Sequence, residues 1–247
     1  MNSSVGSVIV ARKREDVKIK VPNCLIVSGA SSLNEARNLG AARFLTDLIA
    51  FIDDDNGLDK DALDEMAKAF SLSDKIGVVS PVIFDRQGSV WFAGGRFNPL
   101  GMAKIDRTVP RGLRPTETFH DVFMVKREAF EKAGGFDSKR FPFYLGEADL
   151  AERLKRLGYH FFVVPQARVW HDIERGSITR NSHIRNEQRA YLVGRNRLLF
   201  LRLYRSRWWL HLFILPALAV FHILGMVTDR KFSFIRPYLK GIGDGLK

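Results

Sequence analysis

The chain is organised as short apolar runs that alternate with segments of helical spacing. Runs typical of strands cover residues 5–11, 17–21, 24–28, 48–52, 76–84, 120–125 and 161–164. Helices are predicted over about residues 32–45, 58–70, 127–133 and 147–157, from apolar positions at helical spacing or from helix-start signals. This alternation predicts an α/β fold with a mainly parallel central sheet flanked by helices.

Local signals set several of these boundaries. Ser32 followed by Glu35 is a capping-box pattern, which predicts a helix start. Gly134 to Asp137 predicts a turn, and Gly158 ends the last of these helices. Residues 85–118 are rich in Gly, Pro and Arg, so we expect loops with short strands there.

The last quarter of the chain has a different pattern. From about Ser182 it is helical and basic, and residues 208–227 contain no Asp, Glu, Lys or Arg. A helix needs roughly 20 apolar residues to cross a bilayer. His211 and Pro216 interrupt the run and basic residues flank both ends, which favours an interfacial or re-entrant helix pair over a single span. A packed helix of a soluble protein is the alternative.

We therefore predict two domains, an α/β domain over residues 1–180 and membrane-associated helices over residues 181–247. The 247 residues, 46% of them hydrophobic, are enough for such a core. Residues 1–16 have no apolar stretch ahead of their basic run, so we expect no secretory signal.

Charge and cysteine content narrow the classes of partner and site. Lys and Arg number 39 against 27 Asp and Glu, and the net charge of +12 favours polyanions such as nucleic acid, anionic lipid or phosphorylated substrates. Cys24 is the single cysteine, which excludes an internal disulfide and a cysteine-based zinc cluster.

Three consecutive acids, Asp53, Asp54 and Asp55, follow the apolar run at 48–52. Neighbouring carboxylates raise one another's pKa unless a cation compensates. Ligands bind beyond the carboxyl ends of strands in open α/β sheets, and Mg²⁺ takes one or two carboxylates plus substrate phosphates. Because residues two apart on a strand share a face, we expect Asp53 and Asp55 to point at one ion while Asp54 turns away.

The acidic run at Asp53–Asp55 has two other interpretations. Asp runs also cap helices or lie solvated in turns. An EF-hand calcium loop needs Gly at its sixth position and Glu at its twelfth, where a loop starting at Asp53 has Leu58 and Asp64. The EF-hand interpretation is therefore excluded.

A second acidic site lies at the start of the helix over residues 147–157. Glu147 and Asp149 stand in its first turn, where the helix dipole favours ionised carboxylates. Either could accept a proton from a hydroxyl as a general base, although acids in a first turn commonly only cap the helix.

Six segments along the chain form a recognisable combination. They are Ala36-Arg37-Asn38-Leu39-Gly40, Phe51-Ile52-Asp53-Asp54-Asp55, Phe123 to Phe130 with Gly134 to Asp137, Glu147-Ala148-Asp149-Leu150 with Arg153, Val169-Trp170-His171, and Arg195-Asn196. Over about residues 30–200 this combination resembles family-2 glycosyltransferases, and most closely the rhamnosyltransferase-like subgroup.

The resemblance implies a GT-A fold, an inverting mechanism and a nucleoside-diphosphate-sugar donor bound with Mg²⁺ or Mn²⁺. It assigns donor binding to Arg37, Asn38, Asp53, Asp54 and His171. Asp53 and Asp55 would hold the metal, which would neutralise the departing diphosphate. Glu147 falls at the position of the family's catalytic base, with Asp149 as the alternative.

Two departures from the family pattern matter. The family usually has Glu-Asp where this chain has Gly146-Glu147, and a glutamate shifts the reach of the base. Only about thirty residues precede the Asn-x-Gly helix, which is too few for the family's whole nucleotide-binding unit. We expect a shortened nucleotide-binding region: the unit is compressed, the chain is a fragment, or normal donor binding is lost.

Three functional hypotheses follow. The first is an active glycosyltransferase with a glycan or lipid-linked acceptor, at the cytoplasmic face of the cell membrane as a peripheral, re-entrant or single-span protein. The second is a catalytically degenerate scaffold of the same family. The third is a basic nucleic-acid or membrane-surface module. We expect no nucleic-acid partner, because the sequence has no base-stacking or groove-reading motif.

Overall fold

The computed structural model describes residues 5–11, 21, 23–98, 103–172 and 184–247. The chain divides into two compact units, which are described separately. The α/β unit takes in residues 1–96, 104–142 and 146–174. The C-terminal unit takes in residues 97–103, 143–145 and 175–247.

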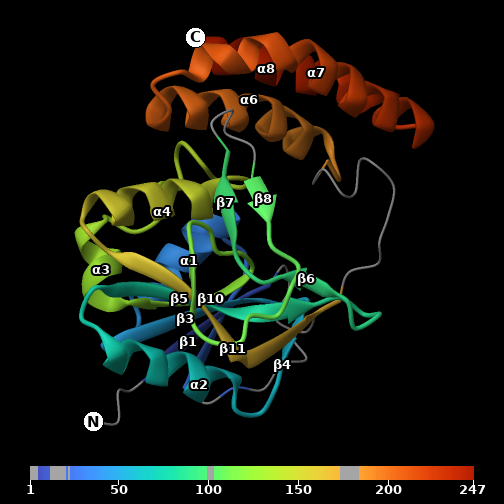
Figure 1. Ribbon diagram of the computed structural model, residues 1–247. Helices are drawn as coiled ribbons and strands as arrows, with labels where there is room; N and C mark the ends of the chain where they lie inside the picture. The colour runs from blue at the N-terminus through green and yellow to red at the C-terminus, as the bar shows by residue number, and fades with distance from the viewer. Residues whose placement is uncertain (1–4, 12–20, 22, 99–102, 173–183) are drawn as a thin grey trace. The chain divides into compact units, whose positions relative to one another are not determined.

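Among the described residues, the α/β unit contains one nine-stranded sheet (Figure 1). The order along its main path is β2 (Cys24–Val27), β1 (Val5–Val10), β3 (Leu48–Asp53), β10 (Val122–Lys126), β5 (Ile76–Phe84), β11 (His160–His171) and β4 (Asn56–Leu58). β6 (Val90–Phe92) pairs with β5, β9 (Arg114–Thr116) pairs with β11, and β7 (Gly95–Phe97) with β8 (Ala103–Ile105) forms a separate ribbon.

The strand directions confirm the predicted mainly parallel sheet. β2, β1 and β3 run parallel to one another, and β5 runs parallel to β11. β10 lies antiparallel between β3 and β5, so the two parallel sets share one direction. The carboxyl ends of β1 and β3 therefore meet at one edge, where Val10 is level with Asp53.

Helices cover both faces of this sheet (Figure 1). α1 (Leu33–Ala41), α3 (Arg127–Lys132) and α4 (Gly146–Arg156) pack on one face, and α2 (Ala62–Ala69) packs on the other. Alternation along β3 explains the division. Phe51 joins the core under α3 and α4, whereas Ala50 and Ile52 join Met66 of α2.

The sequence signals for α1 are confirmed at its start. The Oγ of Ser32 accepts from the backbone N–H of Glu35, and the Glu35 carboxylate accepts in return from the backbone N–H of Ser31. The helix ends at Ala41, four residues before the predicted end. The chain turns there because it must reach the start of β3 at Leu48.

Other boundaries differ from prediction for identifiable reasons. Residues 56–58 form β4 against β11, so the following helix begins at Ala62 instead of Leu58. β11 continues past Val164 to His171 through an irregularity in its pairing with β5. Of the strand predicted at 17–21, residues 17–20 lie outside the described residues.

The C-terminal unit contains α6 (Glu187–Tyr204), α7 (His211–Thr228) and α8 (Ile235–Leu246). α6 and α8 approach closely because glycines line their contact. A Cβ on Gly241 would lie 2.1 Å from the carbonyl oxygen of Tyr191. Asn196, in the Arg-Asn pair of the resemblance, is buried on α6. Its Nδ2 donates to the carbonyls of Phe143 (2.8 Å) and Tyr144 (3.0 Å).

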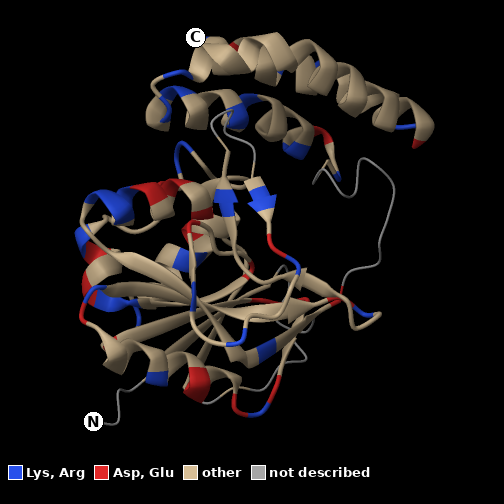
Figure 2. Cartoon of the chain, in the orientation of Figure 1, with Lys and Arg blue, Asp and Glu red and all other residues tan. Residues whose placement is uncertain are grey.

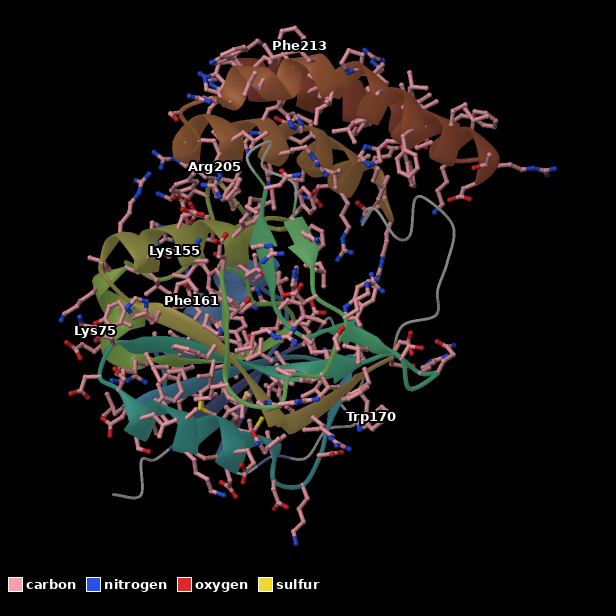
Figure 3. All side chains as sticks on the ribbon, viewed as in Figure 1. Lys75, Lys155, Phe161, Trp170, Arg205 and Phe213 are labelled. Carbon is pink, nitrogen blue, oxygen red and sulfur yellow. The ribbon has the colours of Figure 1, made fainter. Side chains whose placement is uncertain are left out.

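The segment Trp208–Thr228 is long and apolar enough to cross a membrane. It has 21 residues and a mean hydropathy of 2.2, and 22% of its most apolar window is buried within the structure. Figure 2 shows Lys and Arg on α6, whereas α7 carries none. Phe213, labelled in Figure 3, stands on the outer side of α7 and is 76% exposed.

Candidate active site

The candidate site lies where β3, α1 and α4 meet. Arg37, on α1, is fully buried. Its Nη2 donates to Oδ1 of Asp53 over 2.9 Å, and its Nη1 donates to Oε1 of Glu147 over 2.5 Å. One guanidinium therefore joins the acidic end of a central strand to the acidic first turn of α4.

Several neighbours hold this guanidinium in place. Asn34, one helical turn earlier, accepts from Nη1 at 3.3 Å and donates its own Nδ2 to the carbonyl of Phe141 at 2.5 Å. The rings of Phe123 and Phe136 lie 5.7 and 5.3 Å from the guanidinium carbon. The arginine is thus enclosed by rings and hydrogen-bonded to three side chains.

Burial and charge shift the pKa values of all three ionic groups. Burial lowers the pKa of Arg37, but the charges of Asp53 and Glu147 raise it more strongly. Burial raises the pKa of Glu147, but Arg37 outweighs this and brings it below the ordinary 4.5. Burial and three neighbouring carboxylates raise the pKa of Asp53 to about 7, against the opposing effect of Arg37. Glu147 is therefore ionised at neutral pH. The carboxyl group of Asp53 ionises less readily, because burial and the neighbouring carboxylates favour its protonated form.

The strand-alternation argument for the three aspartates is wrong. β3 ends at Asp53, and Asp54 and Asp55 form a turn before β4. The side chain of Asp53 meets Arg37, while Oδ2 of Asp55 lies 3.2 Å from Nε2 of His171. The two residues therefore face different partners, because the backbone leaves the strand conformation between them.

His171, the last residue of β11, lies between two acids. Its Nδ1 is 3.2 Å from Oδ2 of Asp121, which is an ion-pair distance without hydrogen-bond alignment. Burial lowers the pKa of His171, but the hydrogen bond with Asp55 and the charges of the nearby acids raise it overall. His171 was predicted to bind the donor near the metal or diphosphate; the structure places it beside Asp55, and its donor-binding role stays a prediction.

Asn38, predicted to bind the donor, is engaged elsewhere. Its Oδ1 accepts from the backbone N–H of Phe136 (2.9 Å), and its Nδ2 donates to the Phe136 carbonyl (2.8 Å). Gly40 has its own packing role, because a Cβ there would lie 2.3 Å from Val8 on β1. The Asn-x-Gly pattern thus fastens α1 to the Gly135–Phe136 turn and to the sheet.

Asp149 also has a structural partner. It is buried, and its Oδ2 accepts from Nε (3.0 Å) and Nη2 (2.6 Å) of Arg153, one turn along α4. Arg153 in turn donates to the carbonyls of Ala133 and Gly135. This network ties α4 to the α3 turn, so the geometry favours Glu147 over Asp149 as the base.

The residue before Glu147 explains one departure from the family pattern. Gly146 opens α4 directly against Asn34, and a Cβ there would lie 1.9 Å from Nδ2 of Asn34. A larger residue would displace the asparagine that supports Arg37. The glycine is therefore required by the packing that places Glu147.

Three residues of the site were missed from the sequence. They are Asn34, His120 and Asp121. His120 helps to lower the pKa of Glu147, and Asp121 lies beside His171. Both lie just before β10, which is central in the sheet. That position is the one sequence signal for them, because no motif includes them.

The donor atoms around His171 fit a divalent cation in kind. Carboxylate oxygens from Asp55 and Asp121 and an imidazole nitrogen from His171 lie within one small region. Among the residues that the structure describes, no group of three or more His, Cys, Asp or Glu is arranged to hold a metal. These donor atoms are therefore of the right chemical kind for a divalent cation, but they do not form a complete metal site.

Comparison with known proteins identifies related sequences. A family model described as glycosyl transferase family group 2 matches residues 48–237. The chain is 29% identical over 129 residues to an N-acetylglucosaminyl-diphospho-decaprenol L-rhamnosyltransferase of Mycobacterium tuberculosis, in each of two strains. This match covers 44% of the chain and 42% of the relative, so it spans less than half of that protein's length.

Solved structures show the same fold. Residues 1–349 of TarS from S. aureus, in complex with UDP-GlcNAc, align with a TM-score of 0.57 at 10% identity, over 98% of this chain and 80% of that one. GalNAc-T7 with UDP, GalNAc and Mn²⁺ aligns with a TM-score of 0.53 at 14% identity, over 69% of this chain and 44% of that one. These similarities confirm the GT-A fold.

Proposed function

Because this chain belongs to glycosyl transferase family group 2, we propose that it transfers a sugar from a nucleoside-diphosphate-sugar donor to an acceptor hydroxyl with inversion at the anomeric carbon. The observation that carries the proposal is the ion-paired connection Asp53–Arg37–Glu147. It joins an acid at the carboxyl end of a central strand, where ligands bind in such sheets, to an acid at a helix start.

Glu147 is the proposed general base. It takes the proton of the acceptor hydroxyl while the acceptor oxygen forms a bond to the anomeric carbon. The bond from that carbon to the diphosphate breaks at the same time, and the diphosphate leaves with the electron pair. The lowered pKa of Glu147 keeps it ionised and ready to accept the proton, and Arg37 fixes the direction of the carboxylate.

A divalent cation, Mg²⁺ or Mn²⁺, is proposed to act with these residues. When bound, such a cation neutralises the negative charge of the leaving diphosphate. Charge balance in the site supports its presence. Four carboxylates, those of Asp53, Asp55, Asp121 and Glu147, gather there against the charges of Arg37 and His171, and a diphosphate would add more negative charge. Asp55 and His171 are the residues that would hold the cation, while Asp53 is paired with Arg37.

The acceptor is proposed to be lipid-linked or a glycan, at the cytoplasmic face of a membrane. The relative from Mycobacterium tuberculosis carries a lipid-diphosphate acceptor in its name. In this chain, residues 184–247 hold twelve Lys and Arg against three Asp and Glu around the apolar α7. Such a combination suits a surface of anionic lipid.

A catalytically degenerate scaffold is the competing proposal, and substrate turnover separates the two. The protein is incubated with a panel of nucleoside-diphosphate sugars, L-rhamnosyl donors included, with Mn²⁺ and a lipid-linked acceptor. Release of nucleoside diphosphate is measured. We expect turnover by the wild type and a loss of about 100-fold to 10,000-fold in Glu147→Gln.

Asp74→Asn is the matched control, since Asp74 is an exposed carboxylate on the α/β unit that contacts Lys126. It is expected to turn over like the wild type. Wild-type turnover by Glu147→Gln would refute the mechanism. Failure of the wild type to bind any nucleoside diphosphate in calorimetry with Mn²⁺ would favour the scaffold.

A further inference from the structure

Asp121 has an uncommon backbone conformation, and it lies beside His171 in the candidate site. Its φ is +31°, in the left-handed region that glycine adopts readily and other residues seldom do. Asp and Asn tolerate this region better than most residues, but glycine adopts it with the least strain. The presence of an aspartate at position 121 is therefore best explained by what its side chain contacts.

The surroundings of the Asp121 side chain supply that reason. Its Oδ2 lies 3.2 Å from Nδ1 of His171, whose side chain is only 8% exposed. On the other side of the ring, Nε2 of His171 lies 3.2 Å from Oδ2 of Asp55. The imidazole is thus held between two carboxylates, each facing a different nitrogen. Among the described residues, the buried Nδ1 makes no hydrogen bond, and the carboxylate of Asp121 faces it at an ion-pair distance.

The backbone of Asp121 adds a second link to the site. Its carbonyl accepts from the backbone N–H of Asp53 over 3.3 Å. Asp121 therefore touches the end of β3 through its main chain and the end of β11 through its side chain. It lies just before β10, the strand that separates β3 from β5 in the sheet.

We propose that Asp121 is a positioning residue of the donor site, which orients the imidazole of His171 so that Nε2 points towards Asp55, where the metal and the diphosphate would be held. An imidazole that serves a metal site commonly donates its other N–H to a carboxylate, which fixes the ring and its tautomer. Nδ1 facing Asp121 leaves Nε2 directed towards Asp55. This inference rests on the proposed function, and it names a residue that the family motifs in this chain do not include.

Binding of Mn²⁺ tests the proposal without reference to turnover. Calorimetry with Mn²⁺ and UDP, or with the nucleoside diphosphate that the wild type prefers, is compared for the wild type, Asp121→Asn and Asp121→Gly. Removal of such a carboxylate costs about 10-fold to 100-fold in metal affinity, and we expect this loss in both variants. Asp121→Gly is expected to keep or raise the thermal midpoint, because glycine accommodates a φ of +31°.

A double-mutant cycle tests whether Asp121 acts through His171. In a His171→Asn background, Asp121→Asn is expected to cause no further loss of affinity. In turnover assays, the Mn²⁺ concentration for half-maximal rate should rise by about 10-fold or more while kcat at saturating Mn²⁺ changes little. Asp74→Asn again serves as the matched control.

Three outcomes would overturn the inference. One is wild-type affinity for Mn²⁺ and nucleotide in Asp121→Asn. Another is an equal further loss in the His171→Asn background, which would mean that Asp121 acts on the ligand directly. The third is a loss of affinity that accompanies a matching fall in the thermal midpoint of both variants, which would mean a role in folding alone. If the wild type itself binds no nucleoside diphosphate, the proposed function fails instead, so the two failures are distinguishable.

Discussion

Nη1 of Arg37 lies 2.5 Å from Oε1 of Glu147, although 110 positions separate the two residues in the sequence. The arginine is fully buried, and its other terminal nitrogen holds Asp53. The proposed base is therefore fixed by a residue that the sequence suggested would face donor phosphates. Arg37 already has two carboxylate partners. Its main role is therefore to join the end of β3, at Asp53, to the start of α4, at Glu147.

Replacement of Arg37 by methionine is expected to lower the free energy of unfolding. Loss of the guanidinium would leave Asp53 and Glu147 close together and without their cation. Breaking a buried ion pair in this way costs about 3–5 kcal/mol. Urea denaturation followed by circular dichroism measures the change. Arg140→Met, on an exposed arginine, is the control and should stay within about 0.5 kcal/mol. Equal stability of the two variants would contradict the role given to Arg37.

Glu147→Gln is expected to change the pH dependence of stability. The pKa of Glu147 is lowered in the folded protein from its ordinary 4.5, so ionisation of this group stabilises the fold. That contribution is fully present above about pH 4.5 and is lost as the pH falls through the folded pKa. The wild type should therefore exceed Glu147→Gln in stability at pH 7, and the difference should shrink below pH 4.5. Urea titrations at several pH values measure it. A difference that stays constant from pH 7 to pH 3 would show that Glu147 is not held as an anion.

Much of the fold could be predicted from the sequence because its signals are local. The strand at Ile76–Phe84 and the helix start at Ser32 follow from apolar runs and capping residues alone. Asp53 and Glu147 could be located for the same reason. Asp53 directly follows the predicted strand at residues 48–52, and Glu147 opens the predicted helix at residues 147–157. β4 was missed because three residues carry too weak a pattern, and its pairing with β11 is a long-range contact.

The partners within the site could not be predicted in this way. The roles of Arg37 and Asp121 depend on which side chains the sheet order brings together, and β10 inserts between β3 and β5 from far along the chain. The expectation for Asp53 and Asp55 used a local rule, but the strand ends at Asp53, two residues before Asp55, so the rule does not apply. Local periodicity places the acids at the correct edge of the sheet without giving their contacts.

Asn38→Ala should separate a structural role from donor binding. Both polar atoms of the Asn38 amide are bonded to the backbone of Phe136. Loss of these part-buried bonds is expected to cost about 1–3 kcal/mol of stability, with affinity for nucleoside diphosphate and Mn²⁺ little changed. Denaturation and calorimetry on the same preparation measure the two quantities. A fall in nucleotide affinity at unchanged stability would restore the donor-binding role predicted from the sequence.

The exposed side of α7 leads to a prediction about membranes. Phe213, Phe221 and Leu224 project from this helix with roughly half or more of their surface exposed. Arg207 precedes the apolar segment, and Arg230 and Lys231 follow it. Apolar side chains that enter a bilayer gain about 1.5–3 kcal/mol each, and basic residues at both ends add attraction to anionic headgroups that salt weakens.

Flotation with vesicles of phosphatidylcholine and phosphatidylglycerol tests this surface. The wild type should float with anionic vesicles, and Phe213→Asp should weaken binding by about 10-fold or more, since 1.4 kcal/mol corresponds to a factor of ten. Leu45→Asp is the matched control, because Leu45 is 96% exposed in the α/β unit. It should bind as the wild type does. If Phe213→Asp floats as well as Leu45→Asp, the outer side of α7 does not enter the bilayer. If the wild type stays with the soluble fraction at low salt, the membrane prediction fails, and the proposed lipid-linked acceptor loses its main structural support.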